Sequence, residues 1–177
     1  MTDIFFKFIL IKYNPLGRLI IFIITKINFF FISESNQNLL YKSINLDRQY
    51  GKKKLNEILM NEFNLPYDEN RGMFSEHLLL LSSISKKYSN FKSILEIGTF
   101  DGKTALILSR LFPKAKINTI DLNDNENSFS STYDRNKTKA KFISIRNKIL
   151  KKNKKISLFE MNSIRLCKDK NSYDLIW

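Results

Sequence analysis

The fold of this chain is decided by the stretch Ile94-Leu95-Glu96-Ile97-Gly98-Thr99-Phe100-Asp101-Gly102-Lys103-Thr104. A short apolar run ends here in two glycines and leads into a helical pattern. The whole chain of 177 residues has five glycines, so two this close together indicate backbone that a Cβ would obstruct. A strand, a glycine turn and a helix in succession are how α/β proteins bring bare backbone up to a nucleotide.

The sequence on both sides of this stretch predicts a complete βαβ unit. Residues 93–97 form a short, partly β-branched run typical of a buried strand. Residues 102–112 carry an apolar helical face that Pro113 ends, and residues 116–120 are predicted as a second strand. Asp121 follows that strand directly. Ligands bind beyond the carboxyl ends of parallel strands, so the glycine turn and Asp121 are expected at one site.

The segment nearly matches two phosphate-binding motifs but departs from each at a required position. A P-loop needs four residues between its first glycine and Gly-Lys-Thr, and here Thr99, Phe100 and Asp101 are three. Asp101 would also place a negative charge beside the phosphates. The dinucleotide pattern G-x-G-x-x-G requires glycine where Phe100 stands. A different nucleotide-binding α/β enzyme is retained as an alternative.

The segment resembles motif I of the class I S-adenosylmethionine-dependent methyltransferases. That motif is an acidic residue, any residue and then Gly-x-x-x-Gly, which Glu96, Gly98 and Gly102 match. The resemblance implies a ligand with a sulfonium cation and no phosphate, for which an acidic turn is favourable. It also implies that Asp121 binds the ribose hydroxyls, because the family's second motif places a carboxylate there.

The resemblance continues more weakly toward the C-terminus. Residues 155–160 are predicted as a third strand, and Met161-Asn162-Ser163 falls where family members often carry Asp-Ala or Asp-Ser against the adenine. Asn162 departs from the commoner Asp, but an amide is able to pair with the adenine amino group. Residues 173–177 resemble the family's fourth strand. The chain stops there.

The fold that the resemblance implies is an α/β, Rossmann-like parallel sheet of class I methyltransferases, expected to be C-terminally incomplete, with a helical N-terminal region. The resemblance covers residues 75–177, and the family's sheet has further strands. A truncated reading frame or a fragment is therefore the simplest interpretation, and methyl transfer by this chain alone is in doubt. The expected organisation is an N-terminal region over 1–50, a helical lead-in over 51–92 and a partial methyltransferase domain over 93–177.

The resemblance implies S-adenosyl-L-methionine as the cofactor and a small molecule as the methyl acceptor. Glu96 is expected to order the turn and approach the amino-acid end of the cofactor, and Gly102 to allow close packing of helix on strand. The catalytic base and the acceptor stay unassigned, because the segment expected to supply them is missing. The predicted cofactor-binding residues are Glu96, Gly98, Thr99, Gly102, Asp121 and Asn162.

The charge balance bears on partners and compartment. A formal net charge of +13 is enough to attract nucleic acid or an anionic membrane surface. The excess lies in lysine runs without interleaved aromatic residues, so nucleic acid is not predicted as a partner. The single cysteine, Cys167, excludes an internal disulfide and favours a reducing, cytoplasmic setting. The spacing of His, Cys and carboxylates predicts no metal site.

Apolar segments dominate the N-terminal region. Residues 4–11, 19–25 and 27–32 are strongly apolar, but charged and polar residues interrupt them before a spanning length is reached. Residues 4–32 are therefore a candidate for peripheral membrane contact through an interfacial helix. The competing interpretation is packing against the core or a second subunit. A non-enzymatic membrane-associated protein is the second alternative for the whole chain.

Two amphipathic helices are predicted outside the βαβ unit. One covers residues 52–63, and the other is a lysine-rich helix in the segment 128–152. The apolar face of the first is Leu55, Ile58, Leu59 and Phe63, and that of the second is Phe142, Ile145, Ile149 and Leu150.

Overall fold

The computed structural model describes residues 34–68, 73–126, 139–168 and 171–177, and the chain divides into two compact units, residues 1–47 and 48–177. In the first unit, helix α3 spans Glu34–Ser43. It ends where Asn45 takes a φ of 57°, which lets the Leu46 amide bond the Tyr41 carbonyl at 2.8 Å. The predicted apolar segments of residues 4–32 lie outside the described residues. Within the described part, no helix is long and apolar enough to cross a membrane.

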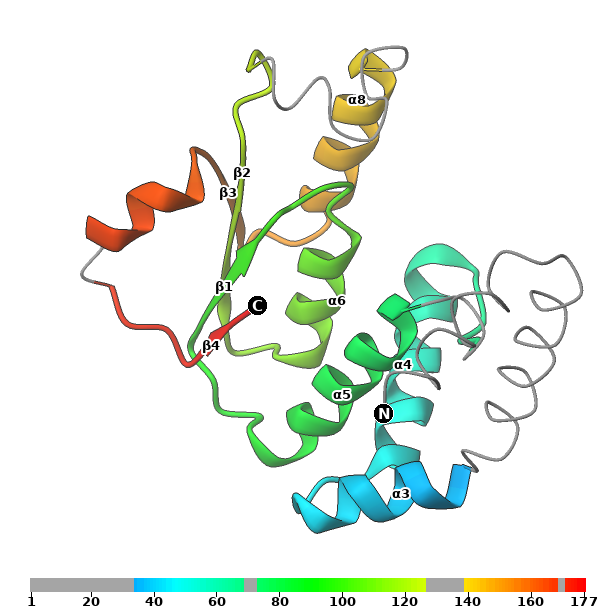
Figure 1. Cartoon of the computed structure of the whole chain (residues 1–177). Coiled ribbons are helices and arrows are strands. Elements are labelled where there is room, and N and C mark those ends of the chain that lie inside the picture. The colour runs from blue at the N-terminus through cyan, green and yellow to red at the C-terminus, as the bar shows by residue number, and fades with distance from the viewer. Residues whose placement is uncertain (1–33, 69–72, 127–138, 169–170) are drawn as a thin grey trace, which may run out of the picture. The chain divides into compact units, whose positions relative to one another are not determined.

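The second unit is built on a parallel sheet with strand order β3-β2-β1-β4 (Figure 1). The sheet pairs Ile97 of β1 with Ile120 of β2, and Asp121 of β2 with Glu160 of β3. This order is that of the first four strands of a doubly wound Rossmann sheet, which confirms the predicted α/β class. The strands are β1 (Ser93–Ile97), β2 (Lys116–Asp121), β3 (Ile156–Glu160) and β4 (Leu175–Ile176).

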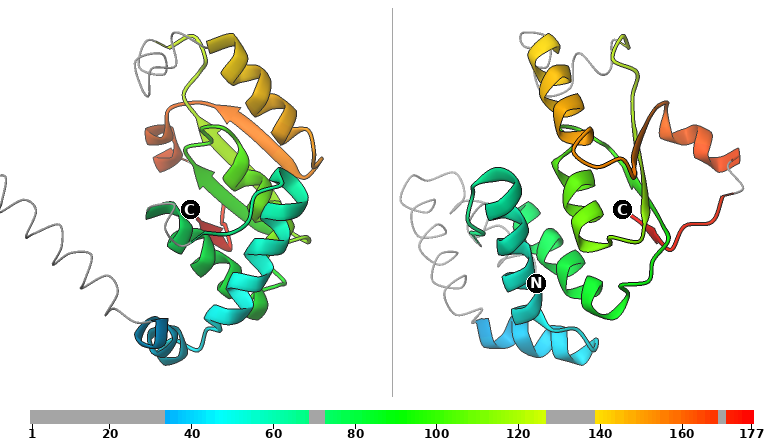
Figure 2. Two further views of the ribbon diagram at one scale, coloured as in Figure 1. Left: turned by 90° about the vertical axis from the view of Figure 1, so that its right-hand side faces the viewer. Right: turned by 180° about the vertical axis from the view of Figure 1, so that it is seen from behind.

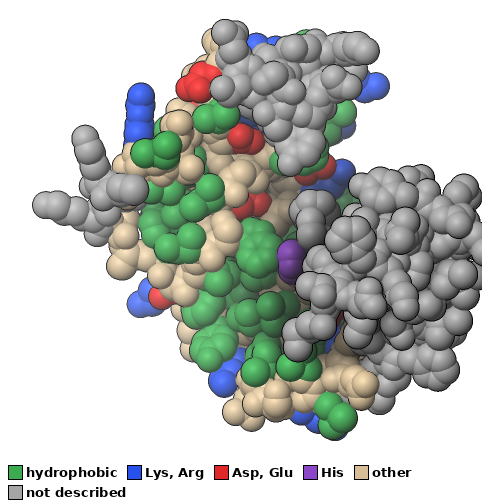
Figure 3. Space-filling view, viewed as in Figure 1, with side chains coloured by type: hydrophobic (Ala, Val, Ile, Leu, Met, Phe, Trp, Pro, Cys, Tyr) green, Lys and Arg blue, Asp and Glu red, His purple; other side chains and the backbone are tan. Residues whose placement is uncertain are grey.

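Helices cover the two faces of this sheet unequally. The views in Figures 1 and 2 place α6 and α8 on one face and the short 3-10 helix η2 on the other. On the covered face, alternate residues of the two central strands are buried, including Ile94 and Ile117. On the other face Ile97 and Phe159 are each 45% exposed, and apolar side chains are visible over the sheet in Figure 3. The helices of this unit are α4 (Arg48–Phe63), α5 (Met73–Lys87), α6 (Lys103–Leu111), α8 (Lys139–Leu150) and η2 (Ser163–Lys168).

Helices α4 and α5 pack closely because a glycine lies at their contact. A Cβ on Gly51 would stand 2.1 Å from Ser83 Oγ and 2.9 Å from the Leu79 carbonyl oxygen. Leu55 and Ile58 are buried on the same side of α4, as the apolar pattern predicts. Helix α4 starts four residues before the predicted residue 52 and ends at Phe63, as predicted.

Gly51→Ala tests whether this close approach limits stability. Alanine favours an isolated helix over glycine by about 1 kcal/mol, but here its methyl group meets α5. We expect the variant to lose about 1 to 3 kcal/mol of unfolding free energy in urea titrations, as overpacked sites do. Lys53→Ala, on the exposed side of α4, serves as the control and should be near neutral. A Gly51→Ala protein as stable as the wild type would show that the two helices separate freely.

Candidate functional site

The turn after β1 has a backbone that explains its glycines. Gly98, Phe100 and Gly102 take φ values of 98°, 45° and 77°. The turn is held at the end of β2, because the amides of Gly98 and Thr99 both donate to the Ile120 carbonyl, at 2.8 and 3.2 Å. L residues rarely adopt positive φ, so Phe100 stores strain that the surrounding bonds must offset.

The two glycines of this turn do different things. No described atom lies within 4 Å of the position of a Cβ on Gly98, which leaves bare, exposed backbone at the carboxyl end of β1. A Cβ on Gly102 would stand 3.0 Å from Leu150 Cδ2 and 3.5 Å from the Arg146 carbonyl oxygen, both in α8. The close packing predicted for Gly102 is therefore present, with α8 as its partner instead of a strand. Its cofactor contact remains a prediction.

Asp121 lies against the glycine turn, where the sequence placed it. Its Oδ2 accepts a hydrogen bond from the Phe100 amide at 2.9 Å, and its Oδ1 accepts one from the Leu122 amide at 2.8 Å. A carboxylate has about four acceptor positions, so these two bonds are compatible with further bonds from ribose hydroxyls. The structure thus brings Asp121, the residue predicted to bind ribose, and the bare backbone of Gly98 together at one edge of the sheet.

Glu96 is buried beneath the turn in a chain of three polar side chains. Glu96 is 1% exposed, and its Oε2 accepts a hydrogen bond from the Thr119 hydroxyl, with 2.5 Å between the two oxygens. The hydroxyls of Thr119 and Thr99 are 2.6 Å apart. Either hydroxyl is able to donate in that pair. The Thr99 side chain therefore points inward, which leaves its backbone to line the predicted cofactor site.

Burial changes the ionisation of Glu96. Loss of solvent raises the pKa of Glu96 from 4.5 to about 8, the Thr119 hydrogen bond opposes this rise, and the charges of Asp101 and Asp121 add to it. Glu96 is consequently neutral at pH 7 in the absence of a ligand. The expected approach of Glu96 to the amino-acid end of a cofactor remains a prediction.

Asn162 begins the segment after β3. The Met161 amide donates to the Asp121 carbonyl at 2.8 Å, so this segment lies directly beside the end of β2. The Asn162 side chain is exposed, and its Oδ1 accepts from the Ile164 amide at 3.0 Å, at the start of η2. Asn162 is thus placed at the predicted edge with its amide oxygen bonded to η2, and its adenine contact is still a prediction.

Asp101 is a residue of the turn to which the sequence analysis assigned no contact of its own. Its Oδ1 accepts from the Lys103 amide at 3.1 Å, at the first residue of α6, and its Oδ2 pairs with Lys103 Nζ at 2.7 Å. The carboxylate therefore occupies the helix N-terminus, where phosphate-binding proteins hold their phosphate. An Asp shortly before a helix start was a usable signal for this cap.

Arg146 is the second residue that the sequence analysis missed. The prediction buried Ile145 in α8, but Ile145 is 45% exposed, whereas the Arg146 side chain is 1% exposed. The prediction for Ile145 was wrong because α8 is rotated so that its inner stripe runs from Phe142 through position 146 to Ile149 and Leu150. That spacing of four, three and one is itself helical, and it was the available signal.

Arg146 joins the ends of two strands. Its Nη1 and Nη2 donate to Oδ1 and Oδ2 of Asp124 at 2.7 and 2.8 Å, and Nη2 lies 3.7 Å from Oε1 of Glu160. Asn123 Nδ2 donates to the other oxygen of Glu160 at 3.0 Å. These bonds connect the loop after β2 with the last residue of β3.

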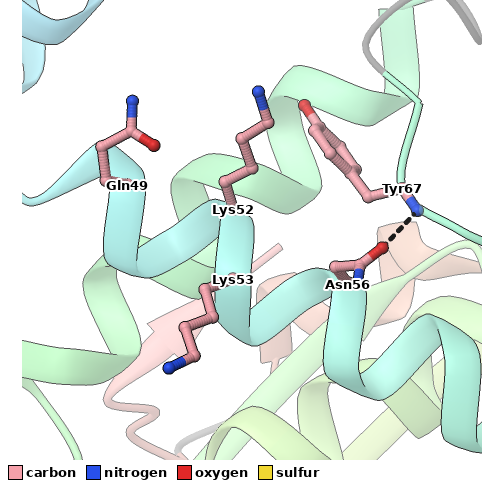
Figure 4. A pocket seen from close by; sticks show the side chains of 5 residues that line it. All are labelled: Gln49, Lys52, Lys53, Asn56 and Tyr67. Atoms are coloured by element: carbon pink, nitrogen blue, oxygen red, sulfur yellow. Dashed lines mark hydrogen bonds between the residues drawn. The ribbon is translucent and has the colours of Figure 1, made fainter.

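Other features of the described residues do not form a competing site. A pocket of about 290 Å³ is lined by residues of α4 and by Tyr67, and it shares no residue with the sheet edge. Figure 4 shows Lys52 and Tyr67 side by side and Lys53 pointing away, so its polar groups do not converge. Asn56 of this pocket is bonded to the Tyr67 amide at 2.9 Å. In the described ranges, no group of three or more His, Cys, Asp or Glu is placed to hold a metal ion.

Comparisons with known proteins give distant likenesses. No protein-family model and no curated protein sequence matches the chain. Among solved structures, a "putative O-methyltransferase" from Klebsiella pneumoniae is 19% identical with a TM-score of 0.34, and it aligns with 80% of this chain and 58% of its own. A "putative caffeoyl-CoA O-methyltransferase" from Staphylococcus aureus is 17% identical with a TM-score of 0.33, over 80% and 57%. The O-methyltransferase TomG from Streptomyces achromogenes, solved in complex with SAM, is 17% identical with a TM-score of 0.35, over 80% and 58%.

The chain therefore spans less than two thirds of the length of these solved structures. At such identities and TM-scores the likeness carries no argument about activity, which has to come from the site itself.

The buried state of Glu96 predicts a pH dependence of stability. Between pH 4.5 and about 8 the Glu96 carboxyl group has lost its proton in the unfolded chain but keeps it in the folded chain. Folding therefore becomes less favourable by up to about 1.4 kcal/mol for each pH unit in that range. Glu96→Gln removes this pH-dependent contribution. The unfolding free energy of the variant relative to the wild type should therefore rise from pH 4.5 to 8 in denaturant titrations. Parallel pH profiles for the two proteins would show that Glu96 titrates normally.

Proposed function

We propose that this chain carries the cofactor-binding part of a class I S-adenosylmethionine-dependent methyltransferase. One observation carries the proposal: the bare backbone of Gly98 opens at a sheet edge surrounded by carboxyl groups. Glu96, Asp101 and Asp121 all belong to this edge, and Lys103 is paired with Asp101 at 2.7 Å. Because Glu96 is neutral at pH 7 and Asp101 is paired with Lys103, this edge has little charge with which to attract a cation, but it disfavours a phosphate, whose negative charge would lie beside Asp101 and Asp121.

We assign a part of the cofactor to each residue. Asp121 would hold the ribose hydroxyls, the Gly98 backbone would face the bound molecule, and Asn162 would lie toward the adenine. Glu96 would pair with the ammonium group at the amino-acid end of the cofactor, and that ammonium group would give the buried carboxyl a counter-charge. S-adenosylmethionine, when bound, supplies an electrophilic methyl group on its sulfonium centre. The chain's own contribution is to position that group for an acceptor.

The alternative of a phosphate-binding α/β enzyme is disfavoured by Asp101. A phosphate at the start of α6 would need the Lys103 amide, which already donates to Asp101 Oδ1 at 3.1 Å. Displacing Asp101 would leave its carboxylate near the phosphate, where like charges repel. The site therefore fits a phosphate-free nucleoside better than ATP or NAD.

Ligand titrations separate these two classes. We expect S-adenosylhomocysteine to bind in calorimetric titrations and to raise the melting temperature, because a ligand that binds only the folded state stabilises it. ATP and NAD, at the same concentration, should leave the melting temperature unchanged. Stabilisation by ATP or NAD but not by S-adenosylhomocysteine would replace the proposal with the phosphate-binding alternative.

Asp121→Asn tests the predicted ribose contact. The variant keeps an acceptor for one backbone amide and removes the charge that strengthens hydrogen bonds to hydroxyls, a loss of about 1.5 kcal/mol or more. We expect at least about ten-fold weaker binding of S-adenosylhomocysteine by calorimetry. Glu57→Gln, at an exposed residue of α4, is the matched control and should bind as the wild type does. Equal affinity of Asp121→Asn and wild type would remove Asp121 from the site.

A further inference from the structure

The buried Arg146 has a position that suggests more than packing. It lies on α8 and reaches Asp124, in the loop that follows Asp121, and Glu160, the last residue of β3, two residues before Asn162. We infer that Arg146 is a positioning residue, which fixes the two loops that bind the nucleoside half of the ligand without touching the ligand itself. This inference rests on the proposed function and extends it to a residue outside the predicted cofactor set.

The geometry of the arginine fork explains the positioning. Two parallel bonds of 2.7 and 2.8 Å to Asp124 fix that carboxylate in both distance and orientation. Asp124 lies three residues after Asp121, so the loop between them is anchored at its far end. A lysine at this position would retain the charge but would not reproduce the planar, two-point contact.

The second arm of the network reaches β3. Glu160 accepts from Asn123 at 3.0 Å and faces Arg146 Nη2 at 3.7 Å, and it is paired with Asp121 in the sheet. The segment that follows Glu160 begins with Met161, whose amide bonds the Asp121 carbonyl at 2.8 Å. One buried guanidinium thus restrains both loops on either side of the proposed ribose and adenine positions.

The same helix also supports the glycine turn. The Phe142 ring lies 5.4 Å from the Phe100 ring, centroid to centroid, and Leu150 fills the space beside Gly102. Helix α8 is therefore a common base for the turn and for the two loops. A displacement of α8 would move the glycine turn and the two loops together. Loss of the bonds from Arg146 alone would release only the loops after β2 and β3.

Affinity measurements on matched variants test this inference. Arg146→Met should weaken binding of S-adenosylhomocysteine and of adenosine by the same factor, about ten-fold, because the released loops contact only the nucleoside part. Asp124→Asn removes the partner charge from a less buried position and should give a similar loss, and Arg146→Lys an intermediate one. The double variant Arg146→Met, Asp124→Asn should lose no more than Arg146→Met, since both changes break one contact.

A control and the contrary results complete the design. Arg110 pairs with Glu62 at 2.7 Å on the exposed side of α6, so Arg110→Met removes an arginine–carboxylate pair away from the loops and should leave both affinities unchanged. Wild-type affinity in Arg146→Met and Asp124→Asn would overturn the inference and leave the proposed function standing. So would a loss confined to S-adenosylhomocysteine, or an equal loss in Arg110→Met. A wild-type chain that binds neither ligand would overturn both.

Discussion

The constraint on which this site depends is a carboxyl group that is buried with no cation beside it in the part of the chain that the structure describes. Glu96 accepts a hydrogen bond from the hydroxyl of Thr119, and the acidic residues Asp101 and Asp121 lie nearby. The folded chain accommodates it as the neutral acid, which couples the ends of β1 and β2 to the turn through Thr119 and Thr99. An uncompensated carboxyl costs stability, and proteins retain such groups mostly where function needs them.

The turn above this group combines openness with acidity. Positive φ at Gly98 and Gly102 folds the backbone back toward β2, and the space at Gly98 stays clear. The amides of Gly98, Phe100 and Lys103 already donate to the Ile120 carbonyl, Asp121 and Asp101, so the turn is a poor match for phosphate. The structure of this edge therefore agrees with the failure of the two phosphate motifs.

Local sequence signals were enough to predict the parallel sheet and the meeting of Asp121 with the glycine turn. The strand at 93–97 was predicted to the residue, because an apolar β-branched run ended in glycines. The meeting of Asp121 with the turn followed from the rule that parallel strands present their carboxyl ends at one edge. Both inferences use neighbours in sequence or a general property of parallel sheets.

The features that sequence did not predict depend on tertiary contacts. Burial of Arg146 instead of Ile145 is set by the rotation of α8 against α6 and β3, which composition alone does not fix. The partner of Gly102 is likewise a side chain of α8, nearly fifty residues away in the chain. The protonation state of Glu96 could not be predicted without knowing that Thr119 faces it from the neighbouring strand.

The most direct test of this account is a carbon-13 NMR titration of the Glu96 side-chain carboxyl, assigned with Glu96→Gln and recorded with and without saturating S-adenosylhomocysteine. The account predicts a titration midpoint near 8 for the free chain and a midpoint below 7 for the complex, because the ligand's ammonium group stabilises the ionised form. A midpoint near 4.5 in the free chain, or one that saturation with the ligand leaves unchanged, would contradict it.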